Sequence, residues 1–381
     1  MRSRSVVLSA VLTTSLGVGV IFGLEAPLIA IVLSRAGHGS AAVGVVNSMG
    51  LAAVILIGPA YPRLIARLGL KHAILTGISS AVLILLLMPV WIGVPSWLLL
   101  RFFTGCVLGL AWIASEIWLN TVAGGNSRGT VMGIYGMVFS TGTAAGPLLL
   151  EITGTNGWAP FLAGAAFLAL TLAPLLVLPN TPRPAGDQQP LGRLVALLPA
   201  APLIMLAAFT AGFVESADLS LLPVFGLRSG LGERDALWLI GVFLAGNVVL
   251  QLPIGLLADR FGRRLLLGVC ALASCLGPAF LHSFLHTPAL LWPLLFVWGG
   301  TLYAFYSQGV ALLGECFGAG QLAGTNTVFV MVYCLGGIIG PSAGGFAMDL
   351  WFPYGLPGLL SAAAAVMLIG VLLLPNIPDI T

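Results

Sequence analysis

Apolar runs of about twenty residues recur along the whole chain, separated by short stretches that hold most of its charges. Charged residues make up 7% of the chain and apolar residues 59%, whereas soluble domains have about 25% and about 45–50%. No water-soluble fold covers its surface with so little charge, so lipid must surround most of the side chains. The sequence therefore predicts an all-α membrane protein, because a run of this length crosses a bilayer as a helix.

Twelve such membrane-spanning segments are expected. They lie near 6–33, 42–61, 71–92, 97–119, 129–151, 157–178, 198–226, 236–258, 265–285, 288–313, 323–349 and 354–375. With both termini in the cytoplasm, eleven basic residues fall on the inner side and only Arg35, Arg228 and Arg234 fall outside. Because short cytoplasmic loops are rich in Lys and Arg, this distribution sets the orientation. We expect a multi-pass protein of a bacterial cytoplasmic (inner) membrane.

A polar cluster at 255–264 recurs in weaker form at 66–71, about half a chain earlier. Gly69 and Gly262 are 193 residues apart, and the Gly-Pro pairs at 146–147 and 340–341 are 194 apart. Two landmarks with nearly the same offset indicate a tandem repeat of six spans. We expect an N-terminal six-helix bundle at 1–179, a Pro-rich cytoplasmic linker at 180–197 and a C-terminal six-helix bundle at 198–381.

The cluster at 255–264 has the order Gly, three residues, Asp-Arg, one residue, Gly-Arg-Arg. This order resembles the loop motif of the major facilitator superfamily, and the resemblance extends over essentially the whole chain. A second motif resembles the glycine–proline motif of antiporters, but its full form lies in span eleven instead of span five. It consists of Gly336, Gly340, Pro341, Gly344 and Gly345. Arg101 begins a segment similar to the span-four arginine motif of proton-coupled carriers, and the chain is most similar to the YcaD-type subgroup.

The resemblance implies a secondary active transporter that moves a small solute by alternating access between two six-helix bundles. It is not expected to be an enzyme, and no catalytic or nucleotide-binding motif occurs in the sequence. We expect no cofactor, no metal site and no nucleic-acid partner; the partners are a small-molecule substrate, protons and the lipid bilayer. We further expect a monomer.

Ionisable side chains at membrane depth are the first candidates for function, because each costs several kcal/mol unless it is paired or hydrated. Glu25 in span one and Arg101 in span four lie at compatible depths, where they form either a substrate or proton site or a fixed ion pair. Trp112 and Glu116 lie within about 60° of Arg101 around the same helix, so the three share one stripe. That stripe either lines a substrate path or lets Glu116 reach the membrane interface.

Glu215 and Asp218 in span seven are three residues apart and lie on one helical face. Two like charges repel there, so at least one should hold a proton or have a cationic partner. We expect this pair to couple transport to protons, unless Asp218 only lies in a wet vestibule. Tyr303 and Tyr306 in span ten either orient a ligand or hold helices together.

The loop cluster is expected to form a gate. Its members are Gly255, Asp259, Arg260, Gly262, Arg263, Arg264 and, at the inner end of span ten, Glu315. By the resemblance, Asp259 should lie against the start of span five, and Arg263 should pair with Glu315. The first half has Ala66, Leu70 and Thr121 at the corresponding positions, so the three members are missing together.

Two other functions stay open. One is an uptake carrier for a flavin-like solute or a metal complex, which the subgroup's relatives suggest. The other, from a different class, is a membrane sensor or scaffold that does not transport. Substrate, direction and coupling ion are not determined by the sequence.

Overall fold

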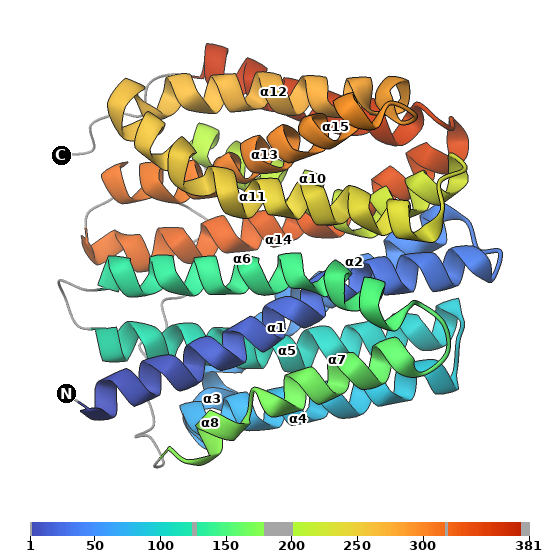
Figure 1. The fold of residues 1–381 in the computed structure, drawn as a ribbon. Helices are drawn as coiled ribbons and strands as arrows, with labels where there is room; N and C mark the ends of the chain where they lie inside the picture. The colour runs from blue at the N-terminus through green and yellow to red at the C-terminus, as the bar shows by residue number, and fades with distance from the viewer. Residues whose placement is uncertain (1, 124–127, 179–200, 317–318, 375–381) are drawn as a thin grey trace. The chain divides into compact units, whose positions relative to one another are not determined.

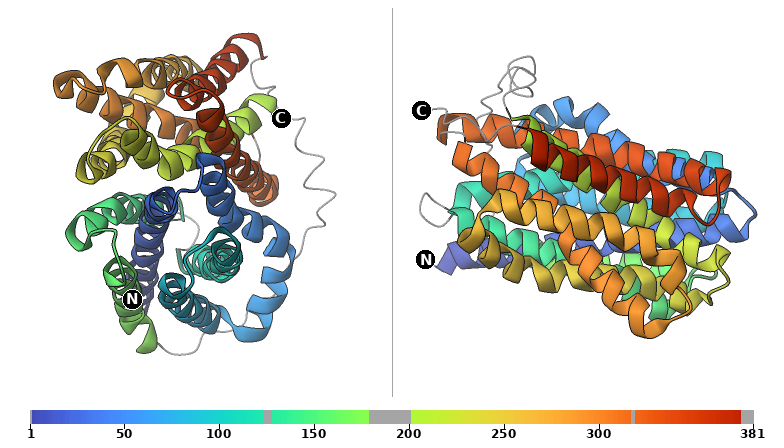
Figure 2. Two further views of the ribbon diagram at one scale, coloured as in Figure 1. Left: turned by 90° about the vertical axis from the view of Figure 1, so that its right-hand side faces the viewer. Right: turned by 90° about the horizontal axis from the view of Figure 1, so that it is seen from above.

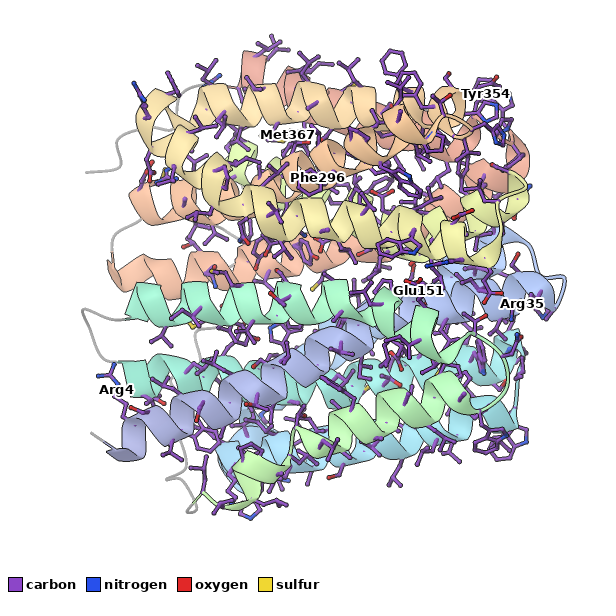
Figure 3. The ribbon with its side chains drawn as sticks, in the orientation of Figure 1. Arg4, Arg35, Glu151, Phe296, Tyr354 and Met367 are labelled. Atoms are coloured by element: carbon purple, nitrogen blue, oxygen red, sulfur yellow. The ribbon has the colours of Figure 1, made fainter. Side chains whose placement is uncertain are left out.

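The computed structural model describes residues 2–123, 128–178, 201–316 and 319–374. Within these ranges twelve helices are long and apolar enough to cross a membrane, which confirms the predicted fold class. Figure 1 labels the helices along the chain, and Figure 3 labels Arg4 and Arg35 near opposite ends of the first one. Their boundaries lie within several residues of those expected.

The chain divides into two compact units, each described here by itself. Unit 1 contains residues 1–38 and 49–188, and unit 2 contains residues 39–48 and 189–381. In unit 1 the described helices are α1 Arg2–Arg35, the second half of α2 Ser40–Ile57, η1 Gly58–Ala60, α3 Tyr61–Leu68, α4 Leu70–Leu87, η2 Met88–Val90, α5 Val94–Ala123, α6 Arg128–Thr153, α7 Ala159–Leu170 and α8 Ala173–Leu176.

In unit 2 the described helices are α10 Pro202–Arg228, α11 Glu233–Phe261, α12 Arg263–Phe284, α13 Pro288–Cys316, α14 Ala319–Leu350 and α15 Gly355–Leu373. The second span is longer than the expected 42–61, because it continues past Pro59 through a short 3₁₀ turn into α3. In the views of Figure 2 the helices of each unit can be followed along and across their axes. The expected linker, 180–197, lies entirely outside the described residues.

The most buried helices are α1 and α10, the first of each half. Within their most apolar windows, 83% and 72% of the residues are buried, against 39–50% in the other spans. Leu56, Leu83 and Ile152 on these other spans keep most of their side-chain surface exposed. Exposed apolar side chains of this kind are compatible with surrounding lipid. The side chains of α1 and α10 are instead surrounded mainly by protein, where polar groups can find partners.

In both units the first helix is in backbone contact with a partner helix. A Cβ added at Gly19 of α1 would overlap the carbonyl oxygen of Phe139 in α6. A Cβ added at Gly212 of α10 would overlap the carbonyl oxygen of Tyr333 in α14. Small residues let membrane helices approach this closely. Because 212 and 333 follow 19 and 139 by 193 and 194 residues, the two units repeat the same packing.

The first residues of α2 belong to unit 2, although the predicted boundary places them in the N-terminal bundle. Asp349 of α14 accepts hydrogen bonds from the backbone N–H groups of Ser40 at 3.1 Å and Ala41 at 2.8 Å. Arg228 of α10 bonds the same carboxylate at 2.6 Å and the Ser40 hydroxyl at 2.8 Å. A carboxylate at a helix N-terminus satisfies N–H groups that have no partner within the helix. The start of α2 is thereby fixed in unit 2.

Candidate functional site

Unit 1 contains a buried ion pair between α1 and α5. The Glu25 carboxylate and the Arg101 guanidinium are in direct contact, with 2% and 11% of their side chains exposed. Gly50 of α2 makes room for the pair, because a Cβ there would lie 3.1 Å from Arg101 Nη2. The predicted meeting of Glu25 and Arg101 is confirmed. Among the described residues, the second carboxylate oxygen of Glu25 has no hydrogen-bond partner.

Below this pair, Trp112 and Glu116 form the predicted stripe on α5. The indole Nε1 of Trp112 donates a hydrogen bond to Glu116 Oε1 at 2.8 Å. The Trp112 ring stacks on Phe139 of α6 with centroids 6.0 Å apart and meets Phe22 of α1 edge-on at 6.1 Å. Glu116 is therefore hydrogen-bonded to an aromatic cluster that is formed by three helices of one unit. Whether this cluster touches a solute stays a prediction.

Unit 2 contains the second acidic position on α10. Glu215 is half-buried, whereas Asp218, one turn further along, is 0% exposed. Tyr333 of α14 donates a hydrogen bond to Glu215 Oε2 at 3.0 Å. Neither carboxylate oxygen of Asp218 has a hydrogen-bond partner among the described residues. An acidic group placed in this way is costly as an anion, so the site favours a neutral form or a cation beside it.

Tyrosines from α13 and α14 form a ring cluster that reaches Glu215 through Tyr333. The ring of Tyr306 lies 5.1 Å from that of Tyr333 and 5.9 Å from that of Tyr303, measured between centroids. Phe329 closes the cluster at 5.2 Å from Tyr306. Sequence reasoning selected Tyr303 and Tyr306 but missed Tyr333. The internal repeat could have identified Tyr333, because this residue is equivalent to Phe139 of the aromatic cluster in the first half.

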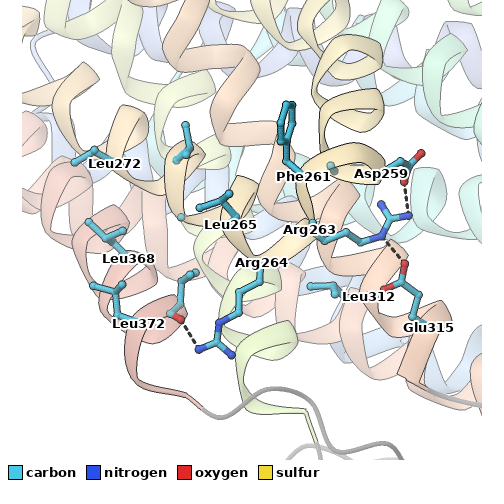
Figure 4. A pocket seen from close by; sticks show the side chains of 15 residues that line it. Asp259, Phe261, Arg263, Arg264, Leu265, Leu272, Leu312, Glu315, Leu368 and Leu372 are labelled. Carbon is cyan, nitrogen blue, oxygen red and sulfur yellow. Dashed lines mark hydrogen bonds and ion pairs between the residues drawn. The ribbon is translucent and has the colours of Figure 1, made fainter.

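The predicted gate residues lie at one end of α11, α12 and α13. Arg263 bonds Glu315 at 2.6 Å, Asp259 at 2.8 Å and the buried Gln308 side chain at 2.9 Å. Figure 4 shows Arg263 between the two carboxylates, at the rim of a cavity of about 940 Å³. The predicted Arg263–Glu315 contact is confirmed. The predicted contact of Asp259 with the start of span five would join the two units and stays a prediction.

Two other members of the loop motif have roles in the backbone: Gly262 adopts a positive φ, and Arg264 caps a helix. Gly262 has φ +95°, a conformation that favours glycine, and Gly69 has φ +81° at the equivalent place. Arg264 donates hydrogen bonds to the carbonyls of Val371 and Leu374, at 2.6 and 2.5 Å. These carbonyls lie at the end of α15, so Arg264 caps that helix. Arg260 lies over the ring of its neighbour Phe261 at 5.4 Å, and nothing lies within 4 Å of a Cβ built at Gly255.

Lys71 is the unit 1 counterpart of Arg264. Its ammonium group donates hydrogen bonds to the carbonyl oxygens of Leu176 and Leu178, where α8 ends. Lys71 lies in the first turn of α4 and is 8% exposed, which is low for a lysine. Sequence analysis treated it only as part of a degenerate motif, whereas the structure gives it a definite capping role.

The glycine–proline motif of α14 is a packing surface. Cβ atoms added at Gly336 and Gly340 would overlap the backbone of Phe209 and Phe213 in α10. A Cβ at Gly344 would press on Leu221, and one at Gly345 would overlap the carbonyl oxygen of Ser40. The Pro341 carbonyl oxygen lies where a Cβ on Gly44 would be. An antiport role for these residues stays a prediction.

The chain matches the family model described as the Major Facilitator Superfamily at residues 7–237 and 230–380. It is 26% identical over 337 residues to the uncharacterized MFS-type transporter YfkF of Bacillus subtilis (strain 168), covering 86% of this chain and 85% of that one. It is 28% identical over 256 residues to the uncharacterized MFS-type transporter YcaD of Escherichia coli, covering 66% and 65%. The expected YcaD-type likeness is thus confirmed.

Solved structures share the fold at low sequence identity. The nucleoside transporter NupG, as a D323A mutant, matches with a TM-score of 0.80 at 15% identity, covering 96% of this chain and 99% of that one. The D-xylose–proton symporter matches with a TM-score of 0.77 at 15% identity, covering 97% of both chains. Together with the family match, these likenesses show that the chain belongs to the Major Facilitator Superfamily and is a multi-pass inner-membrane transporter, not an enzyme.

Proposed function

We propose that this transporter is a secondary carrier driven by protons and that Asp218, together with Glu215, is its proton-binding site. One observation carries the proposal: Asp218 is 0% exposed, and neither of its carboxylate oxygens has a hydrogen-bond partner among the described residues. Taking an unpartnered carboxylate out of water costs several kcal/mol, and a bound proton removes that cost. Asp218 therefore holds a proton in this arrangement.

Glu215 supplies the partner for proton transfer. It lies one helical turn from Asp218 on the same face of α10, is half-buried and accepts the hydroxyl of Tyr333. Moving a proton between the two acids changes which of them is charged without moving the helix. A D-xylose–proton symporter has the same fold, so this fold accommodates proton coupling.

The proton site can be tested without a known substrate. Infrared difference spectra of the purified protein should contain the carbonyl stretch of a protonated carboxylic acid at neutral pH. We expect Asp218→Asn to remove this band and Asp235→Asn, a matched change at an exposed position of α11, to leave it. A band that persists in Asp218→Asn would move the proton site elsewhere, with Glu25 as the next candidate.

Transport provides the second test. A solute found by thermal-shift screening of metabolite and drug libraries would be followed in proteoliposomes. Glu215→Gln should abolish accumulation driven by a pH gradient and leave counterflow exchange largely intact. Equal pH dependence in wild type, Glu215→Gln and Asp218→Asn would refute coupling at this pair.

The cytoplasmic location of both termini is part of the proposal and rests on the Lys and Arg distribution. It places the Arg263 cluster at the cytoplasmic face and Arg228 with Asp349 at the outer face. Maleimide labelling of single cysteines introduced at Arg67 and Arg234 in intact cells should reach only the second position. Labelling of the first position alone would reverse the orientation.

A further inference from the structure

We propose that the solute is an organic cation bearing an aromatic ring and that it is recognised by the ring-and-carboxylate cluster of unit 2. The cluster comprises Glu215, Asp218, Tyr303, Tyr306, Phe329 and Tyr333. The inference rests on the proposed function, which it deepens by naming a class of solute.

The charge balance of the cluster points to a cation. Glu215 and Asp218 carry two acidic groups, and no described basic side chain forms an ion pair with either of them. If Asp218 holds one proton, Glu215 remains as the charged carboxylate. Among the described residues, its hydrogen-bond donor is the neutral phenol of Tyr333. A buried carboxylate is stabilised by an opposite charge, and in this cluster a bound solute would have to supply it.

The rings determine the second property of the solute. Tyr306 packs edge-on against Tyr333 and Phe329, with centroids 5.1 and 5.2 Å away, and Tyr303 lies beside it. The three tyrosines are only half-buried, so part of each ring surface is accessible. Aromatic faces attract cations and pack well on flat rings. An aromatic cation therefore satisfies the rings and the carboxylate together.

The internal repeat shows that the ring cluster is a built feature. Phe22, Trp112 and Phe139 form a mutually contacting triangle in unit 1. At the offsets of 193 and 194 residues, the equivalent positions in unit 2 are Glu215, Tyr306 and Tyr333. Unit 2 thus keeps two rings of the triangle and replaces the third with a carboxylate. In unit 1 a carboxylate also joins the triangle, because Trp112 donates to Glu116 at 2.8 Å.

Three probes separate charge from aromaticity. Tetraphenylphosphonium and tetraphenylborate have the same shape and rings but opposite charges, and tetrabutylammonium has the positive charge without rings. Binding to the purified full chain would be measured by isothermal titration calorimetry, with empty detergent micelles as the blank. We expect tetraphenylphosphonium to bind at least about tenfold more tightly than either of the other two probes.

Variants then locate the site. Glu215→Gln and Tyr306→Leu should each weaken tetraphenylphosphonium binding about tenfold, and Tyr306→Phe should keep it within about threefold. Tyr354→Leu, a matched change at a half-exposed tyrosine outside the cluster, should have no effect. If Tyr306→Leu does not fold, as judged by its melting temperature, Tyr303→Leu takes its place.

Two results would overturn the inference. One is tetraphenylborate or tetrabutylammonium binding as tightly as tetraphenylphosphonium. The other is wild-type tetraphenylphosphonium affinity in folded Glu215→Gln and in the folded tyrosine variant. Failure here is distinct from failure of proton coupling, because the infrared band of Asp218 is measured without any solute. A band without cation selectivity refutes the solute class alone, and selectivity without the band refutes the proton site alone.

Discussion

Glu25 in unit 1 and Asp218 in unit 2 occupy equivalent positions 193 residues apart, and both are almost completely buried, at 1% and 0% exposed. Glu25 contacts Arg101, whereas the residue equivalent to Arg101 is the buried Leu295. The same backbone position thus holds a neutralised acid in one unit and an acid without a cationic partner among the described residues in the other. The repeat therefore preserves the position of the acid but not its partner. This difference supports a fixed ion pair in unit 1 and, under the proposed function, an exchangeable proton in unit 2.

The largest expected effect tests this difference directly. Glu25→Gln should lower the free energy of unfolding by about 3–5 kcal/mol, because it leaves Arg101 buried without its carboxylate. Asp218→Asn should change it by less than about 1 kcal/mol, because a neutral acid is replaced by a neutral amide. Both values would come from denaturant unfolding in detergent at neutral pH.

A double variant serves as the control. Glu25→Gln with Arg101→Leu gives unit 1 the leucine of unit 2 and should recover most of the lost stability, since removing both charges of a buried pair can be nearly neutral. Additive losses in the double variant would mean that the two side chains do not depend on each other. Equal losses in Glu25→Gln and Asp218→Asn would remove the distinction between the units.

The two loops that follow the second span sharpen the comparison. Both contain a glycine with positive φ, and both place a basic side chain on the carbonyls that end the unit's last described helix. We expect Lys71→Met and Arg264→Met each to cost about 2 kcal/mol, because each leaves carbonyls without a charged donor. Lys71→Arg and Arg264→Lys should retain most of the stability in the same unfolding assay. A loss in only one loop would show that only that loop depends on its cap.

Only unit 2 adds the acidic partners of Arg263, so the switching effect should be confined to it. Asp259→Asn should shift the conformational equilibrium toward an inward-open form by about 1–2 kcal/mol, if Asp259 makes the predicted charged hydrogen bond to the start of span five. Ala66→Asp in the first loop should shift nothing, because Leu70 and Thr121 supply no partners. Distances between spin labels on the two units would report the shift. Equal shifts in both variants would contradict a role limited to unit 2.

The smallest effect is expected at Glu315. Its side chain is 56% exposed, and that of Asp259 is 62% exposed. Exposed ion pairs contribute about 0–1 kcal/mol, so Glu315→Gln should hardly change unfolding in detergent. A loss as large as that in Glu25→Gln would mean that the Arg263 cluster supports the fold and does not act as a gate.

The sequence was sufficient for the fold because bilayer thickness fixes the length of each span and long apolar runs mark where each span lies. Glu25 was paired with Arg101 because both charges lie at compatible depths in apolar segments, whereas the pairing of Arg263 with Glu315 came from the family resemblance. Tyr333 and the capping role of Lys71 were missed. Tyrosine and lysine acquire these roles from neighbours more than a hundred residues away, and only the packed helices show which neighbours those are.

The glycines that bring α1 against α6 and α10 against α14 have a mechanical consequence. Helices in backbone contact cannot slide past one another without a steric clash, so each pair moves as one rigid body. Alanine substitutions at Gly19 and Gly142, and at Gly212 and Gly336, should therefore not be tolerated, because each added Cβ would overlap the backbone of the partner helix. Gly133 and Gly136, with nothing within 4 Å of an added Cβ, should accept alanine. A displacement at one end of such a helix pair would then move the other end with it.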